Sequence, residues 1–109
     1  MANLDRGGAN DDEITYAALV EALDDGAVAL VDVREQNEWD AGHVEGSVLH
    51  PLSVFDPEVL PRDKPIVLIC RSGNRSMTAL RAARAAGFTD IWHYKGGAMG
   101  WVREGGELV

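Results

Sequence analysis

The sequence contains a single cysteine, Cys70, and aromatic residues make up only 6% of its 109 positions. One cysteine excludes an internal disulfide bond, so folding does not depend on an oxidising compartment. It also excludes a dithiol mechanism within the chain. No apolar run approaches the roughly 20 residues that cross a membrane. The acidic start of the chain has no apolar core and does not resemble a secretory signal, so we expect a cytoplasmic protein without membrane partners.

Basic residues are also scarce: 10 lysines and arginines stand against 18 acidic residues, and the net charge is −8. This balance argues against non-specific nucleic-acid binding, which needs a basic surface. The imbalance reverses over residues 66–89, which include Arg71, Arg75, Arg81 and Arg84 but no Asp or Glu. A cationic segment in an acidic protein favours a small anionic ligand nearby. We interpret Arg81 and Arg84 as the solvated face of a helix, and Arg71 and Arg75 as candidates for anion binding.

The length suits one domain with a single core. Residues 1–12 are polar and aperiodic, and we expect them to form a flexible tail before a domain spanning residues 13–109. Continuous apolar runs over residues 28–33 and 65–70 predict strands buried on both faces, with shorter strands at 47–50 and 90–94. Helical patterns occupy residues 15–26, 35–42, 74–86 and 96–106, with a helical turn near 54–61. Strands that alternate with helices predict an α/β domain with a mainly parallel sheet, which binds ligands beyond the carboxyl ends of its strands.

The loop "CRSGNRS", residues 70–76, joins a buried strand to a helix. Gly73 allows backbone conformations in which successive N–H groups turn inward. The helix that follows directs its unpaired N–H groups at the loop, and Arg71 and Arg75 add full positive charge. These features lower the pKa of a thiol and stabilise an anion bound to its sulfur. We therefore interpret Cys70 as a nucleophile.

A structural interpretation of the same loop stands beside this one. Free cysteine is among the most buried residue types and is usually inert. Turn formation and helix capping would account for four neighbours of Cys70, namely Ser72, Gly73, Asn74 and Ser76. We expect them to serve both purposes, because a capped turn also builds the anion pocket.

"CRSGNRS" resembles the active-site loop of the rhodanese superfamily of sulfurtransferases. The stretch "VDVREQNEWDAGHVEGSVLHPLS", residues 31–53, resembles the family's Asp-x-Arg signature and the segment after it, and "YKGGAMGWVREG", residues 94–105, resembles its C-terminal segment. The three motifs occur in the family's order and the resemblance covers residues 14–108. It implies a three-layer α/β domain with a central, mainly parallel five-stranded sheet flanked by helices.

The resemblance also implies a chemistry. Rhodaneses move a sulfane sulfur from a donor such as thiosulfate to a thiophile, cyanide or a thiol, through a cysteine persulfide, without a metal or organic cofactor. On this sequence Cys70 would be the nucleophile and persulfide carrier. Arg71 and Arg75 would attract the donor anion. The backbone N–H groups of the loop would cradle the persulfide and the donor, from Arg71, Ser72, Gly73, Asn74, Arg75 and Ser76.

Two further residues, Asp32 and Arg34, follow the first long strand and carry the Asp-x-Arg resemblance. They could help to order the site, but we favour an ion pair that ties the strand end to neighbouring loops. The three histidines lack metal-ligand spacing. We expect His43 to bond a loop backbone and the three tryptophans to pack in or around the core, with Trp101 near the pocket rim.

Two other functions remain in view. Cysteine phosphatases have the motif Cys-x5-Arg. Here Ser76, the residue that follows five intervening residues after Cys70, stands in place of the arginine, and Arg75 lies one position early. The rhodanese-like phosphatases have a loop one residue longer, so we consider phosphatase or arsenate reductase activity less favoured. A regulatory module, or a persulfide carrier that serves a protein acceptor, is the second alternative.

Overall fold

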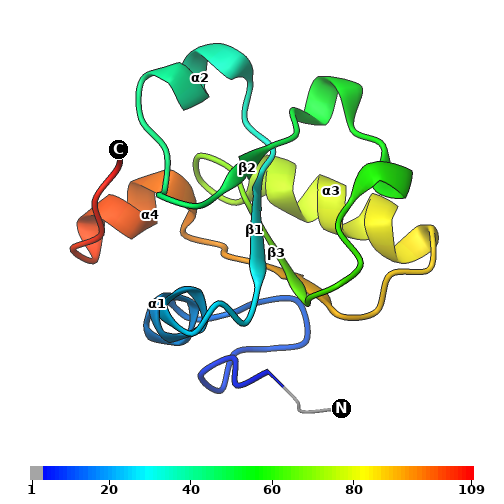
Figure 1. The fold of residues 1–109 in the computed structure, drawn as a ribbon, viewed down its shortest axis with the longest axis horizontal. Coiled ribbons are helices and arrows are strands. Elements are labelled where there is room, and N and C mark those ends of the chain that lie inside the picture. The colour runs from blue at the N-terminus through cyan, green and yellow to red at the C-terminus, as the bar shows by residue number, and fades with distance from the viewer. Residues whose placement is uncertain (1–3) are drawn as a thin grey trace.

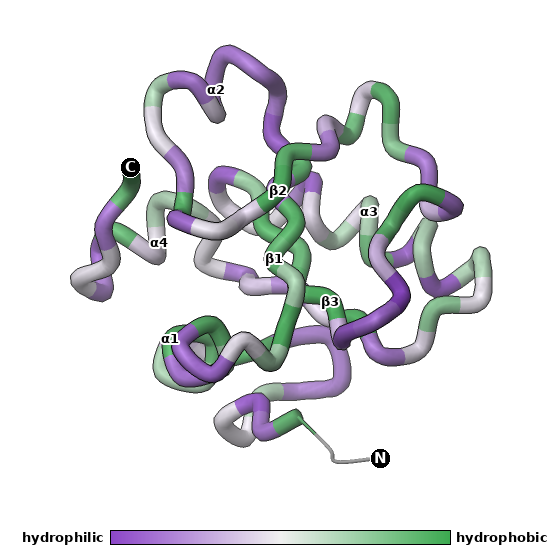
Figure 2. The backbone as a smooth tube through the Cα atoms, viewed as in Figure 1, coloured by the Kyte–Doolittle hydropathy of each residue, from purple (hydrophilic) through white to green (hydrophobic). Residues whose placement is uncertain are grey.

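Four parallel strands form a sheet, and Figure 1 shows strands at the centre of the molecule with helices around them. The computed structural model describes residues 4–109. The strands are β1 (Ala29–Asp32), β2 (Val48–Leu49), β3 (Ile66–Ile69) and β4 (Ile91–His93), in the spatial order β2-β1-β3-β4. The hydropathy colouring shows apolar residues concentrated in the strands, whereas the helix after β1 is polar (Figure 2). These runs lie between covering helices, as their continuous apolar character predicted.

The implied fifth strand is not formed: the described residues contain four. The place beside β4 is taken by Glu13, which makes one parallel bridge with His93. Around it the His93 N–H donates to the Asp12 carbonyl at 2.9 Å, and the Ile14 N–H donates to the His93 carbonyl at 3.2 Å. The first helix begins at Tyr16, so the chain leaves the sheet edge before a ladder can lengthen.

The helices lie where the sequence predicted them. α1 (Tyr16–Asp24) is capped by the Thr15 hydroxyl, which accepts from the Ala18 N–H. The others are α2 (Gln36–Asp40), α3 (Asn74–Ala85) and α4 (Gly97–Arg103), and two 3₁₀ turns span Leu52–Val54 and Pro57–Val59. None of the described helices is long and apolar enough to cross a bilayer.

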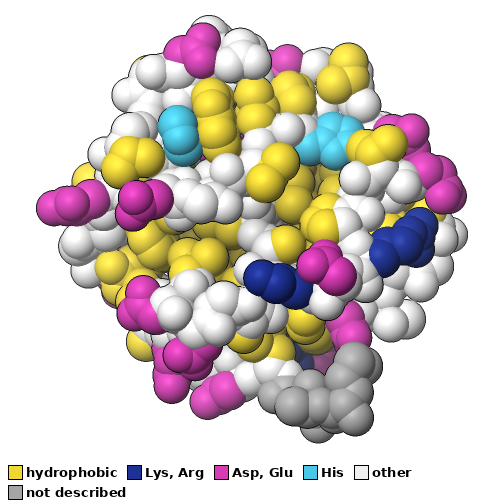
Figure 3. All heavy atoms as spheres, in the orientation of Figure 1, with side chains coloured by type: hydrophobic (Ala, Val, Ile, Leu, Met, Phe, Trp, Pro, Cys, Tyr) yellow, Lys and Arg dark blue, Asp and Glu magenta, His cyan; other side chains and the backbone are white. Residues whose placement is uncertain are grey.

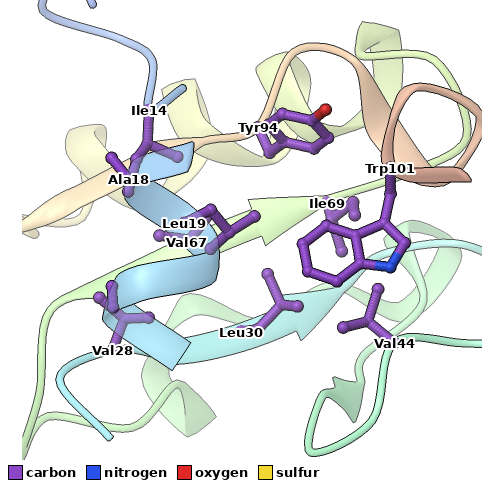
Figure 4. Packing of buried hydrophobic residues seen from close by; sticks show 11 residues of the cluster. Ile14, Ala18, Leu19, Val28, Leu30, Val44, Val67, Ile69, Tyr94 and Trp101 are labelled. Carbon is purple, nitrogen blue, oxygen red and sulfur yellow. The ribbon is translucent and has the colours of Figure 1, made fainter. Parts of the chain in front are cut away.

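Alternate residues of each strand face opposite layers, because side chains in a strand alternate between the two faces of a sheet. Leu30, Val67 and Ile69 pack with α1, Tyr94 and Trp101 (Figure 4). The opposite face holds Val31, Ile66, Leu68, Cys70 and Ile91, packed against Ala79, Leu80 and Ala83 of α3. The result is the three-layer arrangement that the resemblance implied.

Residues 4–12 of the expected tail lie against the domain, and residues 1–3 lie outside the described part of the chain. Arg6 stacks over the Trp92 ring at 5.0 Å. Arg84, which we expected on a solvated helix face, instead forms an ion pair with Asp12, whereas Arg81 is exposed. On the face drawn in Figure 3, acidic side chains lie mainly near the edge and few basic ones appear, in keeping with the net charge.

Candidate functional site

The strand order changes direction between β1 and β3. β2 follows β1 on one side, and β4 follows β3 on the other. The two central strands are in register with Asp32 beside Ile69, so their carboxyl ends lie next to each other. An open parallel sheet binds ligands at such a point. Cys70 is the residue that follows β3 and therefore lies at this crevice.

The Cys70 side chain points toward the beginning of α3, because it lies on the same sheet face as Leu68. The residue is only 1% exposed. Its Sγ accepts a hydrogen bond from the Gly73 N–H at 3.1 Å and lies 3.5 Å from the Ser76 Oγ. The sulfur therefore sits inside the turn of the loop, where the sequence placed it.

The environment of Cys70 favours the thiolate. Burial raises the pKa of the Cys70 thiol, but hydrogen bonds from the Ser76 hydroxyl and from the backbone N–H groups of Ser76, Gly73 and Ser72 together lower it below its ordinary value. These donors stabilise negative charge on the sulfur through fixed dipoles. The same donors would stabilise an added sulfur that carries the charge.

Two close backbone approaches fix the loop against the start of α4. Gly73 has φ +104°, and a Cβ there would lie 2.4 Å from the Lys95 carbonyl oxygen. Gly97 has φ +65°, and its Cβ would lie 2.2 Å from the Arg71 carbonyl oxygen. The Ala98 N–H donates to the Cys70 carbonyl at 2.8 Å, as the Met99 N–H does to Arg71 at 3.1 Å. Gly73 and Gly97 therefore hold the cysteine loop against the start of α4.

The structure separates the two loop arginines that we assigned to anion attraction. Arg71 is exposed and has no acidic partner among residues 4–109. Arg75 instead forms two bonds to the Glu38 carboxylate, at 2.6 and 2.8 Å. Its guanidinium holds the pKa of Glu38 at about 2. Of the remaining loop residues, Ser72 and Asn74 are exposed, whereas Gly73 and Ser76 are buried.

Asp32 and Arg34 form the buried ion pair that we favoured. The Arg34 Nη2 donates to Asp32 Oδ2 at 2.8 Å and to the Gly42 carbonyl at 2.8 Å. Their side chains are 2% and 7% exposed. The pair ties the end of β1 to the turn after α2, and none of its hydrogen bonds reaches Cys70. Its contribution to the site is to hold α2, which carries Glu38.

The other marked residues have mainly structural surroundings. The His43 Nδ1 lies 3.1 Å from the Trp39 carbonyl oxygen, and its ring stacks on Trp39 at 3.6 Å, so the expected backbone bond is formed. Trp101 is buried in the core and its Nε1 donates to the Glu107 carbonyl. Within residues 4–109, no group of His, Cys, Asp or Glu side chains is arranged to hold a metal ion.

A pocket of about 470 Å³ lies beside the loop, between α2 and α4. Its apolar lining residues are Ala41, Ala98, Met99, Val102 and Leu108, and its charged lining residues are Arg34, Glu38, Arg71 and Arg103. Like Arg71, Arg103 has no acidic partner in the described chain. The pocket shares a wall with the loop, because Ala98 bonds the Cys70 carbonyl. Its size suits an organic ligand rather than a bare inorganic anion.

Three functional candidates were not found from the sequence. Glu38 and His93 lie 37 and 17 residues from their loop partners, Arg75 and Ser76. Neither has a spacing that would connect it to the loop. The third, Gly97, meets Arg71 only through the way in which two strand ends lie side by side.

Comparison with known proteins agrees with this geometry. Residues 15–104 match the Rhodanese-like domain family. The chain belongs to the rhodanese family. A rhodanese-related protein from Thermoplasma volcanium is 33% identical with a TM-score of 0.81, covering 90% of this chain and 97% of that one. The human single-domain sulfurtransferase TSTD1, 24% identical, has the same fold with a TM-score of 0.74, over 88% of this chain and 98% of that one.

Two curated relatives of this rhodanese-like domain are longer proteins. A probable adenylyltransferase/sulfurtransferase, MoeZ of Mycobacterium tuberculosis, is 41% identical over 96 residues, which are 84% of this chain and 24% of MoeZ. A tRNA uridine(34) hydroxylase of Citrobacter koseri is 34% identical over 105 residues, 87% of this chain and 30% of the hydroxylase. The chain therefore spans less than a third of either relative, and its homologues include a sulfurtransferase and a hydroxylase.

Substitution of Gly97 tests the contact between α4 and the loop. Gly26→Ala is the matched control, because Gly26 has φ +63° but open space around its Cβ. We expect Gly26→Ala to lower the free energy of unfolding by about 1 kcal/mol through backbone strain alone. Gly97→Ala should cost at least about 2 kcal/mol more, because backbone atoms must move. Equal costs in urea unfolding would contradict the close approach.

The Arg75–Glu38 pair predicts a pH-dependent contribution to stability. The folded pKa of Glu38, about 2, lies below its ordinary value of 4.5. The stabilisation is therefore present above pH 4.5 and is lost as the pH falls toward 2. We expect Glu38→Gln to lower the free energy of unfolding by about 1–2 kcal/mol at pH 7 and by much less near pH 2. Glu58→Gln, in the exposed Arg62–Glu58 pair, should change little at either pH in urea unfolding.

Proposed function

We propose that the chain is a sulfurtransferase that moves a sulfane sulfur from a small anionic donor, such as thiosulfate, to a thiol or cyanide through a persulfide on Cys70. The observation that carries the proposal is the Cys70 sulfur held inside a turn of N–H donors. The Gly73 N–H lies 3.1 Å from it, and the surroundings lower the pKa of the thiol. Membership of the rhodanese family supports the same chemistry.

In the first half-reaction the Cys70 thiolate attacks the outer sulfur of thiosulfate. A new S–S bond forms at Cys70 as the S–S bond of the donor breaks, and sulfite leaves with the electron pair. Charge is conserved, because a thiolate and a thiosulfate dianion become a persulfide anion and a sulfite dianion. The loop N–H groups would hold the added sulfur, and Arg71, which has no acidic partner in residues 4–109, would attract the donor.

In the second half-reaction an acceptor thiolate attacks the outer sulfur of the persulfide. A new S–S bond forms on the acceptor as the S–S bond at Cys70 breaks, and Cys70 departs as a thiolate. We assign the pocket beside the loop to this acceptor. The apolar side chains of the pocket would make no favourable contact with thiosulfate or cyanide, but they would bind a hydrocarbon chain. Arg71 and Arg103 would bind a carboxylate. An organic thiol that carries an anionic group and an apolar part therefore fits best. Two half-reactions at one nucleophile imply ping-pong kinetics.

The phosphatase alternative is disfavoured by Ser76. This residue occupies the position of the phosphate-binding arginine, is buried, and has its hydroxyl engaged by Gly73 and His93. Arg75, one position earlier, is engaged by Glu38. Neither side chain is arranged to clamp a phosphoryl group. The protein-acceptor alternative keeps the same persulfide and differs only in what enters the pocket.

The nucleophile is tested by mass spectrometry. Purified protein treated with thiosulfate should gain the mass of one sulfur, and cyanide should remove it. Cys70→Ser should gain nothing, because an alcohol cannot form the persulfide. A wild-type protein that accepts no sulfur from any donor tried would refute the proposal. Hydrolysis of p-nitrophenyl phosphate, assayed in parallel, would favour the phosphatase instead.

The pocket is tested with two acceptor thiols, neutral 2-mercaptoethanol and anionic 6-mercaptohexanoate. With the persulfidated enzyme we expect a higher kcat/KM for 6-mercaptohexanoate. Arg103→Gln should reduce that value about two- to fivefold at low salt, because an exposed charge contributes modestly. Arg81→Gln removes an exposed arginine that does not line the pocket and should leave kcat/KM unchanged. Equal use of both thiols would contradict this assignment.

A further inference from the structure

The hydroxyl of Ser76 lies close to the Cys70 sulfur. Three neighbouring atoms can accept a hydrogen bond from it. Ser76 is fully buried in the first turn of α3. Its Oγ lies 3.5 Å from Cys70 Sγ, 3.2 Å from the Gly73 carbonyl oxygen and 2.8 Å from His93 Nδ1. A hydroxyl donates one proton but accepts through two lone pairs. Whether the Ser76 hydroxyl donates its hydrogen bond to the sulfur therefore depends on whether His93 Nδ1 donates or accepts.

His93 is held firmly in place. It ends β4 and is 1% exposed, and it lies on the α3 face of the sheet like Ile91, two residues earlier. Its backbone N–H and carbonyl are bonded to Asp12 and Ile14. In the described part of the chain, its Nε2 is buried without a hydrogen-bond partner. Among residues 4–109, Ser76 is thus the hydrogen-bonding partner of the ring.

The two neutral tautomers of His93 differ in their effect on Ser76. With the proton on Nε2, a buried N–H would have no acceptor, which is costly, and Nδ1 would consume the Ser76 proton. With the proton on Nδ1, the Ser76 oxygen accepts a hydrogen bond from His93. The Ser76 O–H is then available to donate to another acceptor. That proton then turns from the Gly73 carbonyl to the sulfur whenever the sulfur is charged, since hydrogen bonds to an anion are the stronger ones.

We propose that His93 is a positioning residue for Cys70: as the Nδ1–H tautomer it donates to Ser76 Oγ and so directs the Ser76 hydroxyl at the sulfur. A role of His93 in turnover rests on the proposed sulfur transfer. The hydrogen-bond chain from His93 through Ser76 to Cys70 does not depend on that proposal. No proton moves along the chain in this arrangement. The hydroxyl adds one donor to the backbone N–H groups that stabilise the thiolate and the persulfide anion.

The charges around the chain are compatible with a neutral imidazole. Burial lowers the pKa of His93, and the positive charges of Lys95 and Arg84 lower it further, against opposing effects of Glu13 and Asp12. Arg75 interacts electrostatically with Cys70, but its guanidinium is paired with Glu38. A neutral His93 cannot serve as a cationic partner of the thiolate. Its contribution is the direction of one hydrogen bond.

The first test measures the rate at which iodoacetamide alkylates Cys70 as a function of pH, which reports the thiolate fraction without any sulfur donor. Ser76→Ala and His93→Leu should each slow alkylation about tenfold near pH 7, the effect of losing one charge-assisted hydrogen bond. His93→Asn keeps a side-chain N–H near the Nδ1 position and should stay within about threefold of wild type. The double variant should be no slower than Ser76→Ala.

Ser47→Ala is the matched control, since it deletes a hydroxyl bonded to the Val44 carbonyl. It should not change the alkylation rate. The inference is overturned if His93→Leu alkylates like wild type, or if the two losses multiply in the double variant. Thermal unfolding establishes that each variant is folded.

A second measurement needs no substitution. The ¹⁵N chemical shifts of the His93 ring in the wild-type protein should show a protonated Nδ1 and a bare Nε2 near pH 7.5. An Nε2–H tautomer would overturn the inference even if His93→Leu failed to fold. If alkylation and tautomer agree with the proposal but no donor transfers sulfur, the proposed function fails and the hydrogen-bond chain stands.

Discussion

The site depends on the close contact between the cysteine loop and the backbone that leads into α4. Gly73 lies against the Lys95 carbonyl and Gly97 against the Arg71 carbonyl, at distances that leave no space for a side chain. The Ala98 and Met99 N–H groups then bond the carbonyls of Cys70 and Arg71. With its carbonyls bound outside, the loop is free to turn its own N–H groups inward. The sulfur is therefore surrounded by N–H donors of the loop, whereas the carbonyls of Cys70 and Arg71 point away from it.

The pleat of the sheet decides what the sulfur meets. Leu68 and Cys70 face α3, and His93, in register with Leu68 on β4, faces the same way. A shift of one residue in β3 would turn Cys70 toward α1 and away from the helix N-terminus. The hydrophobic packing of Ile66 and Leu68 against α3 fixes that register. Core packing and chemistry are thus set by the same alternation of side chains.

The sequence was sufficient for the elements that depend on neighbouring residues. The strands, the capped α1 and the Cys70 loop follow from local apolar runs, Thr15 and Gly73. The ion pair of Asp32 and Arg34 was also accessible, since the residues are two positions apart. The partners of Arg75 and Ser76 were not, because Glu38 and His93 reach them only through the strand order. The prediction of a fifth strand was wrong, because α1 begins too soon after Ile14 for a strand to form there.

The pairing of Arg75 with Glu38 changes how the site stabilises anions. The two loop arginines together would have placed two positive charges beside the sulfur, but Glu38 offsets one of them. What remains is Arg71, which is exposed and lines the pocket beside the loop, and a set of dipoles around Cys70. Dipoles fixed by the backbone suit a single diffuse charge on sulfur and need no reorganisation when it forms. A phosphoryl group carries more charge and requires a clamp that neither Arg75 nor Ser76 can provide, so the ion pair that orders α2 against the loop supports the proposed sulfur transfer over phosphate hydrolysis.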